Sequence, residues 1–280
     1  MELIYDGLDM LLPFAWMEYT FMKHALLAIL LMTPLFGLLS TMVVSSRMAF
    51  FSDSLGHGAF TGIAIGAIVG SIAPLTSLIL FSIVFALLIT YIKHKTAASA
   101  DTVIGVFSST AIAVGLMIMS HGGGFSKFSP LLIGDILSIT PADLMGLCAV
   151  NALVLIGWVL LFNQLLLLSV NASLARSRGI STIVVESLFA ALLAVVVAVS
   201  IQWVGILIIN ALLVLPGAAA RNIARSVKEY HLASIMIALV SGFVGLFSAY
   251  YLGIAAGAAI VATAAALFFL SLAVRPHIRM

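Results

Sequence analysis

The sequence SDSLGHGAFTG at residues 52–62 places an acid and an imidazole inside a chain that is otherwise strongly apolar. If this stretch is helical, Asp53 and His57 leave the same face about one turn apart. A carboxylate oxygen and an imidazole nitrogen at that separation can hold one divalent cation between them. This mixed donor pair suits Zn, Mn or Fe and does not choose among these metals.

Two simpler interpretations of these residues remain open. Ser52 or Asp53 could cap the start of a helix that enters a membrane, and His57 could be a core histidine bonded to a neighbouring carbonyl. Ionisable groups within an apolar span are costly, however, and by default they mark a functional site. The sequence therefore favours a role for Asp53 and His57 in binding a metal or a proton.

Glycines follow at four-residue spacing, so one face of the same helix would have no side chains. Such a stripe lets a second helix approach backbone to backbone. We expect close helix packing at Gly58, Gly62, Gly66 and Gly70.

The composition indicates the class of protein. Of the 280 residues, 64% are hydrophobic and 8% are charged, whereas ordinary soluble domains carry about 25% charged residues. Together with a mean hydropathy of +1.29, this predicts an all-α, polytopic integral membrane protein. The formal net charge of +2, without a basic cluster, argues against nucleic acid as a partner. The single cysteine, Cys148, excludes an intrachain disulfide and any cysteine-based metal cluster.

A spanning helix needs about 20 mostly apolar residues, and nine segments of the chain come close to this length. We expect one membrane domain over residues 1–280, a bundle of about 8–9 transmembrane helices, with residues 1–19 outside or at the membrane surface. The segment 204–220 contains Pro216 and Gly217, so whether it spans fully stays open. No internal repeat is evident. The nine segments are 21–44, 52–71, 75–92, 102–120, 144–168, 183–201, 204–220, 232–252 and 254–274.

Basic residues predict the orientation, because they collect in cytoplasmic loops. If the nine segments cross alternately, five groups of basic residues fall on one side, and the opposite loops keep only Lys127. The N-terminus is therefore predicted outside and the C-terminus inside. The five groups are Arg47, Lys93/Lys95, Arg176/Arg178, Arg221/Arg225/Lys228 and Arg275/Arg279.

The chain lacks the Gly-x-x-x-x-Gly-Lys-Ser/Thr phosphate loop and the His-Glu-x-x-His motif, so it is not predicted to be an ATPase or a familiar metalloprotease. Uphill transport would need an ion gradient or an ATPase on another chain. The polar stretch 169–182 lies on the predicted cytoplasmic side. Ser169 or Asn171 can cap a short helix there, and Gly179 can end it. Such a helix would offer a docking surface; an ordinary connector is the alternative.

Four stretches resemble, in order and spacing, the membrane permeases of the metal-uptake ABC transporter family, most closely those of the bacterial zinc system. Manganese and iron permeases belong to the same family. The resemblance covers nearly the whole chain from about residue 20, after an N-terminal segment longer than in many relatives. The four stretches are RMAFFSDSLGHGA (47–59), DTVIG (101–105), IGDILSITPADL (133–144) and the segment from VGILII to LPGAAAR (204–221).

The resemblance implies a role for each matching residue. Asp53 and His57 match the positions at which the family holds its metal at the centre of the translocation path. The family's permeases pair, so two copies would supply up to four ligands, which suits a four-coordinate zinc. Residues 171–180 match the coupling helix that receives the ATPase stroke, although Asn171 and Ala172 stand where family members usually carry acids. The residues assigned to coupling are Asn171, Ser173, Leu174, Ala175, Arg176 and Gly179.

The resemblance also implies a transport subunit of the bacterial cytoplasmic (inner) membrane that is not itself an enzyme. Its expected partners are a second permease copy, separate ATPase subunits and an extracytoplasmic metal-binding protein. No permanent cofactor is expected, and Zn²⁺, or else Mn²⁺ or Fe, is the transported substrate. Two other classes stay open: a proton-coupled secondary metal transporter, in which residues 171–180 form a passive loop, and a non-transporting membrane anchor.

Three residues on the predicted outer side are weaker candidates. His121 sits beside three glycines and could hand metal inward, although an exposed loop histidine is more often incidental. Asp135 and Asp143 could meet a substrate-binding protein or could be solvated loop acids.

Three further polar residues have mainly structural interpretations. Asp101 is interpreted as a helix N-cap, with Thr102 following. Gln202 and Asn210 lie in or beside predicted spans. They could line a path or form hydrogen bonds between helices.

Overall fold

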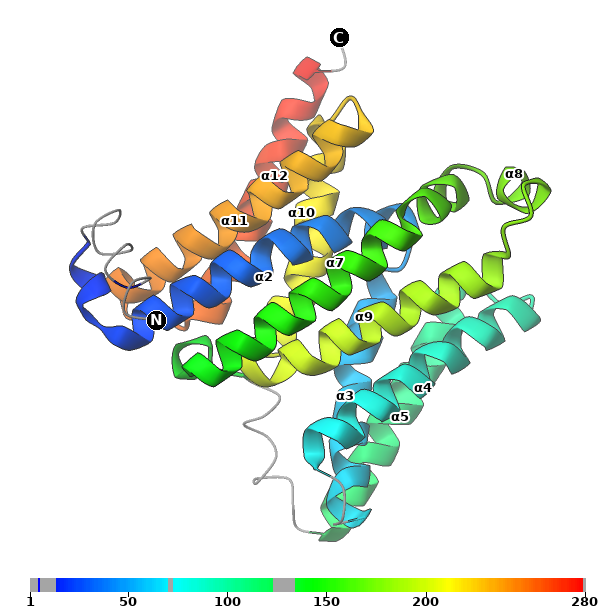
Figure 1. The fold of residues 1–280 in the computed structure, drawn as a ribbon, viewed down its shortest axis with the longest axis horizontal. Helices are drawn as coiled ribbons and strands as arrows, with labels where there is room; N and C mark the ends of the chain where they lie inside the picture. The colour runs from blue at the N-terminus through cyan, green and yellow to red at the C-terminus, as the bar shows by residue number, and fades with distance from the viewer. Residues whose placement is uncertain (1–4, 6–13, 70–72, 123–133, 279–280) are drawn as a thin grey trace.

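The computed structural model describes residue 5 and residues 14–69, 73–122 and 134–278. Within these residues all regular structure is helical, which confirms the predicted all-α bundle (Figure 1). The long helices are α2 (Thr20–Ser45), α3 (Ala49–Val69), α4 (Pro74–Lys95), α5 (Ala100–Gly122), α7 (Pro141–Val170), α9 (Thr182–Val204), α10 (Ile206–Ile223), α11 (Val227–Leu252) and α12 (Ala256–Ile278). The short elements are η1 (Ala15–Glu18), η2 (Ile136–Ser138) and α8 (Ala172–Ser177).

Long apolar runs explain why the sequence forms these helices. Among the described residues, eight helices are long and apolar enough to cross a membrane, and they include every long helix except α3. The segment left open at 204–220 is α10, an 18-residue helix that belongs to this set. α3 has 21 residues, but Asp53 and His57 lower its mean hydropathy. The one long helix outside the set is thus the helix that carries the candidate site.

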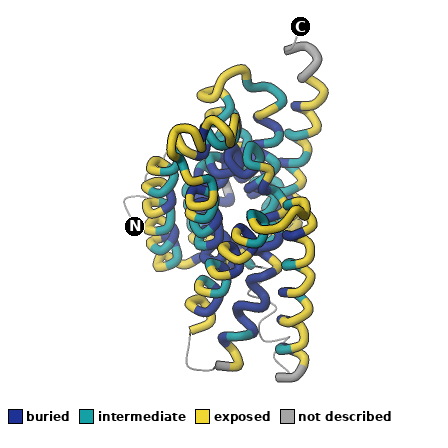
Figure 2. Tube along the Cα trace, turned by 90° about the vertical axis from the view of Figure 1, so that its right-hand side faces the viewer, coloured by how far each residue is buried: buried dark blue, intermediate teal, exposed yellow. Residues whose placement is uncertain are grey.

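The helices form three groups. α7 lies between α2 and α9 across the middle of the bundle, with α3, α4 and α5 packed together beside α9, and α10, α11 and α12 beside α2 (Figure 1). Buried residues gather where the groups meet, and exposed residues follow the outward faces (Figure 2). α2 is the most enclosed span at 67% buried, whereas α7 and α12 are each 22% buried. Exposed faces that stay apolar are typical of helices that contact lipid.

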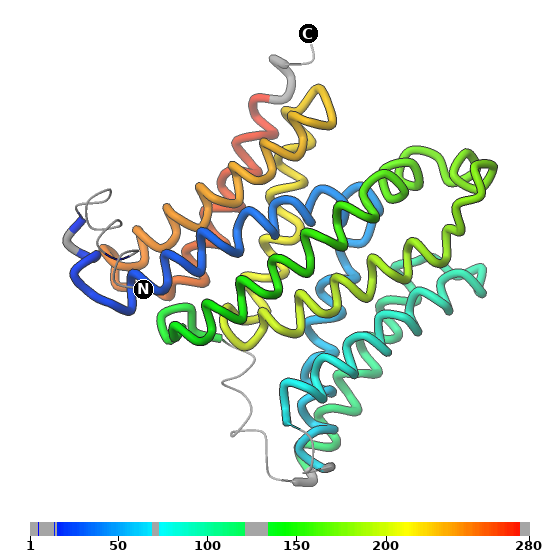
Figure 3. The backbone as a smooth tube through the Cα atoms, viewed as in Figure 1, coloured from blue at the N-terminus to red at the C-terminus, as the bar shows by residue number. Residues whose placement is uncertain are grey.

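The helix contacts repeat, although the sequence shows no internal repeat. In the first unit, α2–α5, α3 packs against α4 and α5; in the second unit, α9–α12, α10 packs against α11 and α12. The first helix of each unit also packs against the third helix of the other, since α2 contacts α11 and α9 contacts α4. Exchanging the units leaves this pattern unchanged, and α2 and α9 run in opposite directions (Figure 3). The units therefore meet along the α2–α11 and α4–α9 contacts, at a direct α3–α10 contact, and through α7, which packs against both α2 and α9.

A close approach of two backbones fixes α10 against α2. The Gly217 N–H donates to the hydroxyl of Ser40 at 2.8 Å. A Cβ added at Gly217 would lie 2.6 Å from the Ser40 carbonyl oxygen, too close for a side chain at this position. The crossing of α10 over α2 therefore depends on glycine, and it sets the position of Asn210 earlier in the same helix.

Much of the predicted outer segment 1–19 lies outside the described residues. Its described end contains η1, where the Trp16 side chain is fully buried. The Trp16 ring packs edge-on against Phe243 of α11 with 6.4 Å between centroids, and Phe14 meets Phe247 at 5.9 Å. Aromatic packing of this kind anchors the described end of the segment to α11.

Candidate functional site

A tight reversal of the chain positions the Asp–His pair. α2 ends at Ser45, and Arg47 takes a left-handed conformation with φ 56° before α3 starts at Ala49. The Ser52 hydroxyl donates to the carbonyl of Ala49 at 2.8 Å and so does not cap the helix. Asp53 lies one turn inside α3, which removes the interpretation of this residue as an N-cap.

Asp53 and His57 share one face of α3. The distance between Asp53 Oδ2 and His57 Nε2 is 3.6 Å. The other carboxylate oxygen, Asp53 Oδ1, accepts a hydrogen bond of 2.6 Å from Asn210 Nδ2 on α10. The side chains of Asp53 and His57 are 48% and 46% exposed on the single chain, so His57 is not a core histidine. A cation held between Oδ2 and Nε2 would remain open on its outer side.

One chain supplies only part of a metal site. In the part of the chain that the structure describes, no group of three or more His, Cys, Asp or Glu side chains is placed to hold a metal. Asp53 and His57 therefore give two protein ligands, whereas zinc sites usually have three or four. The same face of α3 continues at Phe50, which is 65% exposed. An exposed aromatic residue beside a half-exposed polar pair suits contact with another protein surface.

The glycine stripe lies against α4. A Cβ added at Gly62 would be 3.1 Å from Cα of Leu78, and one added at Gly66 would be 2.7 Å from Cβ of Ser77. The Ser77 hydroxyl also donates to the carbonyl of Gly62 at 2.8 Å. Gly70 lies outside the described residues. α4 thus approaches the backbone of α3 closely, as expected for glycines at this spacing.

The first glycine of the stripe faces a ring and not a backbone. A Cβ added at Gly58 would lie 3.1 Å from the Phe85 ring of α4. Phe85 in turn stacks on Phe81, with 5.5 Å between the ring centroids. Because Gly58 directly follows His57, this aromatic contact holds the side of α3 next to the candidate site.

The predicted short helix in the 169–182 segment is α8. Asn171 caps it, because its side-chain oxygen accepts hydrogen bonds from the N–H groups of Ser173 at 2.9 Å and Leu174 at 3.1 Å. Ala175 is fully buried, and Leu174 is 43% exposed. Gly179 follows in a left-handed conformation with φ 77°, which suits the end of a helix. α8 therefore presents an apolar side chain on a short, well-capped helix between α7 and α9.

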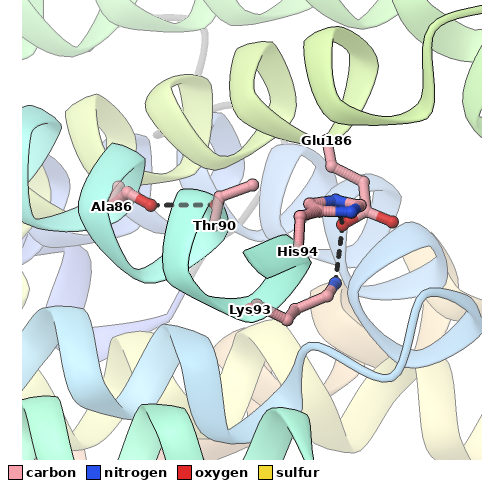
Figure 4. A network of polar contacts seen from close by, with 5 residues as sticks. All are labelled: Ala86, Thr90, Lys93, His94 and Glu186. Carbon is pink, nitrogen blue, oxygen red and sulfur yellow. Dashed lines mark hydrogen bonds and ion pairs between the residues drawn. The ribbon is translucent and has the colours of Figure 1, made fainter. Parts of the chain in front are cut away.

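A charged cluster links α4 to α9 near α8. Glu186, in the second turn of α9, faces Lys93 and His94 at the end of α4 (Figure 4). Its Oε2 atom accepts from Lys93 Nζ at 2.6 Å and from His94 Nε2 at 3.0 Å. One turn earlier, the Thr90 hydroxyl donates to the carbonyl of Ala86 at 2.9 Å and so stays within α4. Sequence reasoning used Lys93 only for orientation and missed Glu186.

The outer acids have structural partners. Asp135 caps η2 by accepting from the N–H of Leu137 at 3.0 Å. Asp143 forms a capping box with Thr140 at the start of α7 and accepts from Trp203 Nε1 at 2.9 Å. Both acids therefore have local capping roles, and contact with a binding protein stays a prediction. His121 lies in the last turn of α5, and its side chain is outside what the structure describes.

The prediction that Asp101 caps a helix is wrong. α5 begins at Ala100, so Asp101 already lies in its first turn. Ser99 takes the capping role, because its hydroxyl oxygen accepts from the N–H of Thr102 at 3.1 Å. Of the polar residues near spans, Gln202 is exposed in α9, whereas Asn210 bonds to Asp53.

Eight helices apolar enough to cross a membrane, a half-exposed Asp–His pair on α3 and a short capped helix between two spans define a polytopic membrane protein. The chain belongs to the ABC 3 transport family, whose sequence profile matches residues 18–275. It is a multi-pass ABC-type metal-uptake permease, as the sequence resemblance predicted.

Relatives with different named metals match over nearly the whole chain. The manganese import system permease protein ScaB of Streptococcus parasanguinis is 30% identical over 262 residues, which cover 94% of this chain and 93% of that protein. The high-affinity zinc uptake system membrane protein ZnuB of Buchnera aphidicola subsp. Baizongia pistaciae is 27% identical over 247 residues, covering 88% and 94%. The solved structure of PsaBC from Streptococcus pneumoniae in complex with Fab superposes with a TM-score of 0.79 at 29% identity, covering 97% of this chain and 95% of that one.

Proposed function

We propose that this permease carries a divalent metal, with Zn²⁺ as the preferred cargo, from outside the cell into the cytoplasm. The observation that carries the proposal is the Asp53–His57 pair, half exposed on α3 with 3.6 Å between Oδ2 and Nε2. A buried pair would not reach a second chain, and a fully solvated one would have no reason to lie in a membrane bundle. The pair is suited to a site that two chains complete.

A second copy of the chain would complete the ligand set. Two copies related by a two-fold axis present the same surface to each other, so two Asp53–His57 pairs would face one metal. Two carboxylate oxygens and two imidazole nitrogens form a four-coordinate site of the kind zinc prefers. Mn²⁺ is the second candidate, because the relative ScaB is named as a manganese permease and Mn²⁺ accepts carboxylate ligands.

The energy would come from separate ATPase subunits, because the sequence has no phosphate-binding loop. α8 is their docking element in this proposal, on the side where the basic residues place the cytoplasm. An extracytoplasmic protein would deliver the metal to the opposite side. The chain would then lie in the cytoplasmic membrane with its N-terminus outside and its C-terminus inside.

α9 connects α8 to the helix that carries the site. α8 leads directly into α9, and α9 packs against both α3 and α4. Glu186 ties α9 to the end of α4 through Lys93 and His94. A displacement of α8 would therefore move α9 and, with it, α3, which carries Asp53 and His57, and α4, which packs against α3. In this mechanism, inward movement of α3 opens the pair to the cytoplasm and releases the metal.

Competition uptake tests the proposal. Vesicles that contain this chain with its partner ATPase should accumulate Zn²⁺ only when ATP is supplied, and Zn²⁺ should be taken up in preference to Mn²⁺ at equal concentration. Vesicles with the ATPase alone are the control. Uptake driven by a proton gradient and indifferent to ATP would instead support a secondary transporter, and preferred uptake of Mn²⁺ would reassign the cargo.

A further inference from the structure

We propose that Asn210 is a positioning residue that holds the Asp53 carboxylate so that only one of its oxygens is offered to the metal. This inference rests on the proposed function of the Asp53–His57 pair. Holding the carboxylate in this way would make the site selective between metals, because a carboxylate that binds through one oxygen favours metals of low coordination number. Asn210 would thus help the site to discriminate Zn²⁺ from Mn²⁺.

The first support is the hydrogen bond itself. Asn210 Nδ2 donates to Asp53 Oδ1 at 2.6 Å. The NH₂ group of the amide is its donor, so this end of the side chain faces Asp53. The second carboxylate oxygen, Oδ2, is left facing His57 Nε2 at 3.6 Å. The metal-binding edge of the pair is therefore Oδ2 and Nε2.

The second support is the environment of the amide oxygen of Asn210. Asn210 Oδ1 is buried and has no hydrogen-bond partner among the described residues. Leaving such an acceptor unpaired is costly, because it loses its bonds to water and gains none in the protein. Gly56 of α3 lies beside this amide: a Cβ added there would be 2.9 Å from Ile206 Cγ2, which is too close, and 3.4 Å from Asn210 Oδ1, an ordinary contact. An asparagine with an unpaired buried oxygen is expected only where its NH₂ group makes a bond that matters. The one described hydrogen bond of Asn210 goes to Asp53.

The third support is the repeat in the fold. Asp53 lies four residues after Ala49, the first residue of α3, and Asn210 lies four residues after Ile206, the first residue of α10. α3 and α10 are the second helices of the two units, and they contact each other. The acid and the amide thus occupy equivalent positions at the place where the two units meet. The fold itself brings the donor to the carboxylate.

The effect on metal choice follows from coordination chemistry. With Oδ1 occupied by the amide, each chain gives one oxygen and one nitrogen, and two chains give a four-coordinate set that suits zinc. Without the amide, the carboxylate can turn and bind through both oxygens. More oxygen ligands and a higher coordination number suit Mn²⁺ better. Loss of Asn210 should therefore weaken Zn²⁺ binding more than Mn²⁺ binding.

Equilibrium binding of Zn²⁺ and Mn²⁺ to the purified full-length chain tests the inference. Asn210→Leu removes the donor at similar volume, and Asn210→Ala provides a second variant should Leu disturb packing. We expect either change to weaken Zn²⁺ binding by about 10–100-fold, the usual loss when a residue that orients a metal ligand is removed. Because Mn²⁺ binding should change less, the preference for Zn²⁺ over Mn²⁺ should fall.

Asn222→Leu is the matched control. Asn222 lies on the same helix, and its Nδ2 donates to Ser271 Oγ on α12 at 2.9 Å, far along the helix from Asp53. This variant should keep both wild-type binding constants. Wild-type binding by both Asn210 variants would overturn the inference. Equal weakening for the two metals, with a fall in thermal stability like that of Asn222→Leu, would also overturn it, since it shows a merely structural role.

Asp53→Asn separates this inference from the proposed function. If Asp53→Asn abolishes binding while the Asn210 variants bind both metals as the wild type does, only the role of Asn210 is wrong. If Asp53→Asn itself binds metal with the wild-type constants, the pair is not the transport site. The proposed site and the role of Asn210 would then fall together.

Discussion

Replacing Asp53 with Asn and His57 with Ala in the same chain should lower ATP-dependent metal uptake by about a hundredfold or more, because loss of even one residue that supports a ligand costs 10–100-fold. The bundle should stay folded. Both side chains are about half exposed on the single chain, so their replacement leaves no large cavity in the core. Uptake in vesicles with the partner ATPase measures the effect, alongside the amount of assembled complex.

Asp101→Asn is the control for this double variant. It also removes an exposed carboxylate from a membrane helix, in the first turn of α5, and it should leave uptake unchanged. Wild-type uptake by the Asp53→Asn/His57→Ala chain, in properly assembled complexes, would show that the metal passes elsewhere. Loss of assembly in the double variant would instead indicate that the pair holds the two chains together.

Leu174→Asp on α8 should abolish the coupling between the ATPase and the permease while sparing metal binding. Leu174 is 43% exposed on a helix whose other face is anchored by the fully buried Ala175. A charge at an apolar docking contact is expected to cost about 2 kcal/mol or more, roughly a thirtyfold loss of affinity. Co-purification of the ATPase, uptake and direct metal binding are measured on the same variant.

Ala98→Asp is the control for the α8 variant. Ala98 is exposed in the link between α4 and α5, on the predicted cytoplasmic side. The Ala98→Asp substitution therefore adds the same charge as Leu174→Asp, but away from α8. It should keep the ATPase bound. If Leu174→Asp retains ATPase binding and uptake, α8 is an ordinary connector, the alternative that the sequence left open.

Most of the helix bounds follow from the sequence, because long apolar runs leave little choice of structure. The predicted span 144–168 corresponds to α7 (Pro141–Val170), and the predicted span 183–201 to α9 (Thr182–Val204). Local capping chemistry also predicts α8 from Asn171 and Gly179. The same chemistry fails at Asp101, because Ser99, two residues earlier, is an equally good cap and the helix starts there.

The repeat of the two four-helix units is not visible in the sequence. Equivalent positions carry different residues, as Asp53 and Asn210 show, because the equivalence lies in helix packing and not in side-chain identity. The repeat is defined by contacts between helices that are far apart in the chain. Only the folded chain reveals them.

The Asp–His pair of the candidate site could be predicted from the sequence, whereas its partners from distant helices could not. The spacing of Asp53 and His57 on one helix is a local pattern, and the structure places the pair on one face as expected. Asn210 is 157 residues from Asp53, and Glu186 lies in an apolar run with no local signal for its partners. Contacts of this range depend on how the units pack, which periodicity does not encode.

Zinc X-ray absorption on the purified chain, combined with the metal-to-protein ratio, tests whether two chains share one transport site. We expect one Zn²⁺ for every two chains, with four oxygen or nitrogen ligands at about 2.0–2.1 Å. The signal should be lost in the Asp53→Asn/His57→Ala chain. One Zn²⁺ per chain, or a ligand set that survives in the double variant, would contradict a transport site shared between two Asp53–His57 pairs.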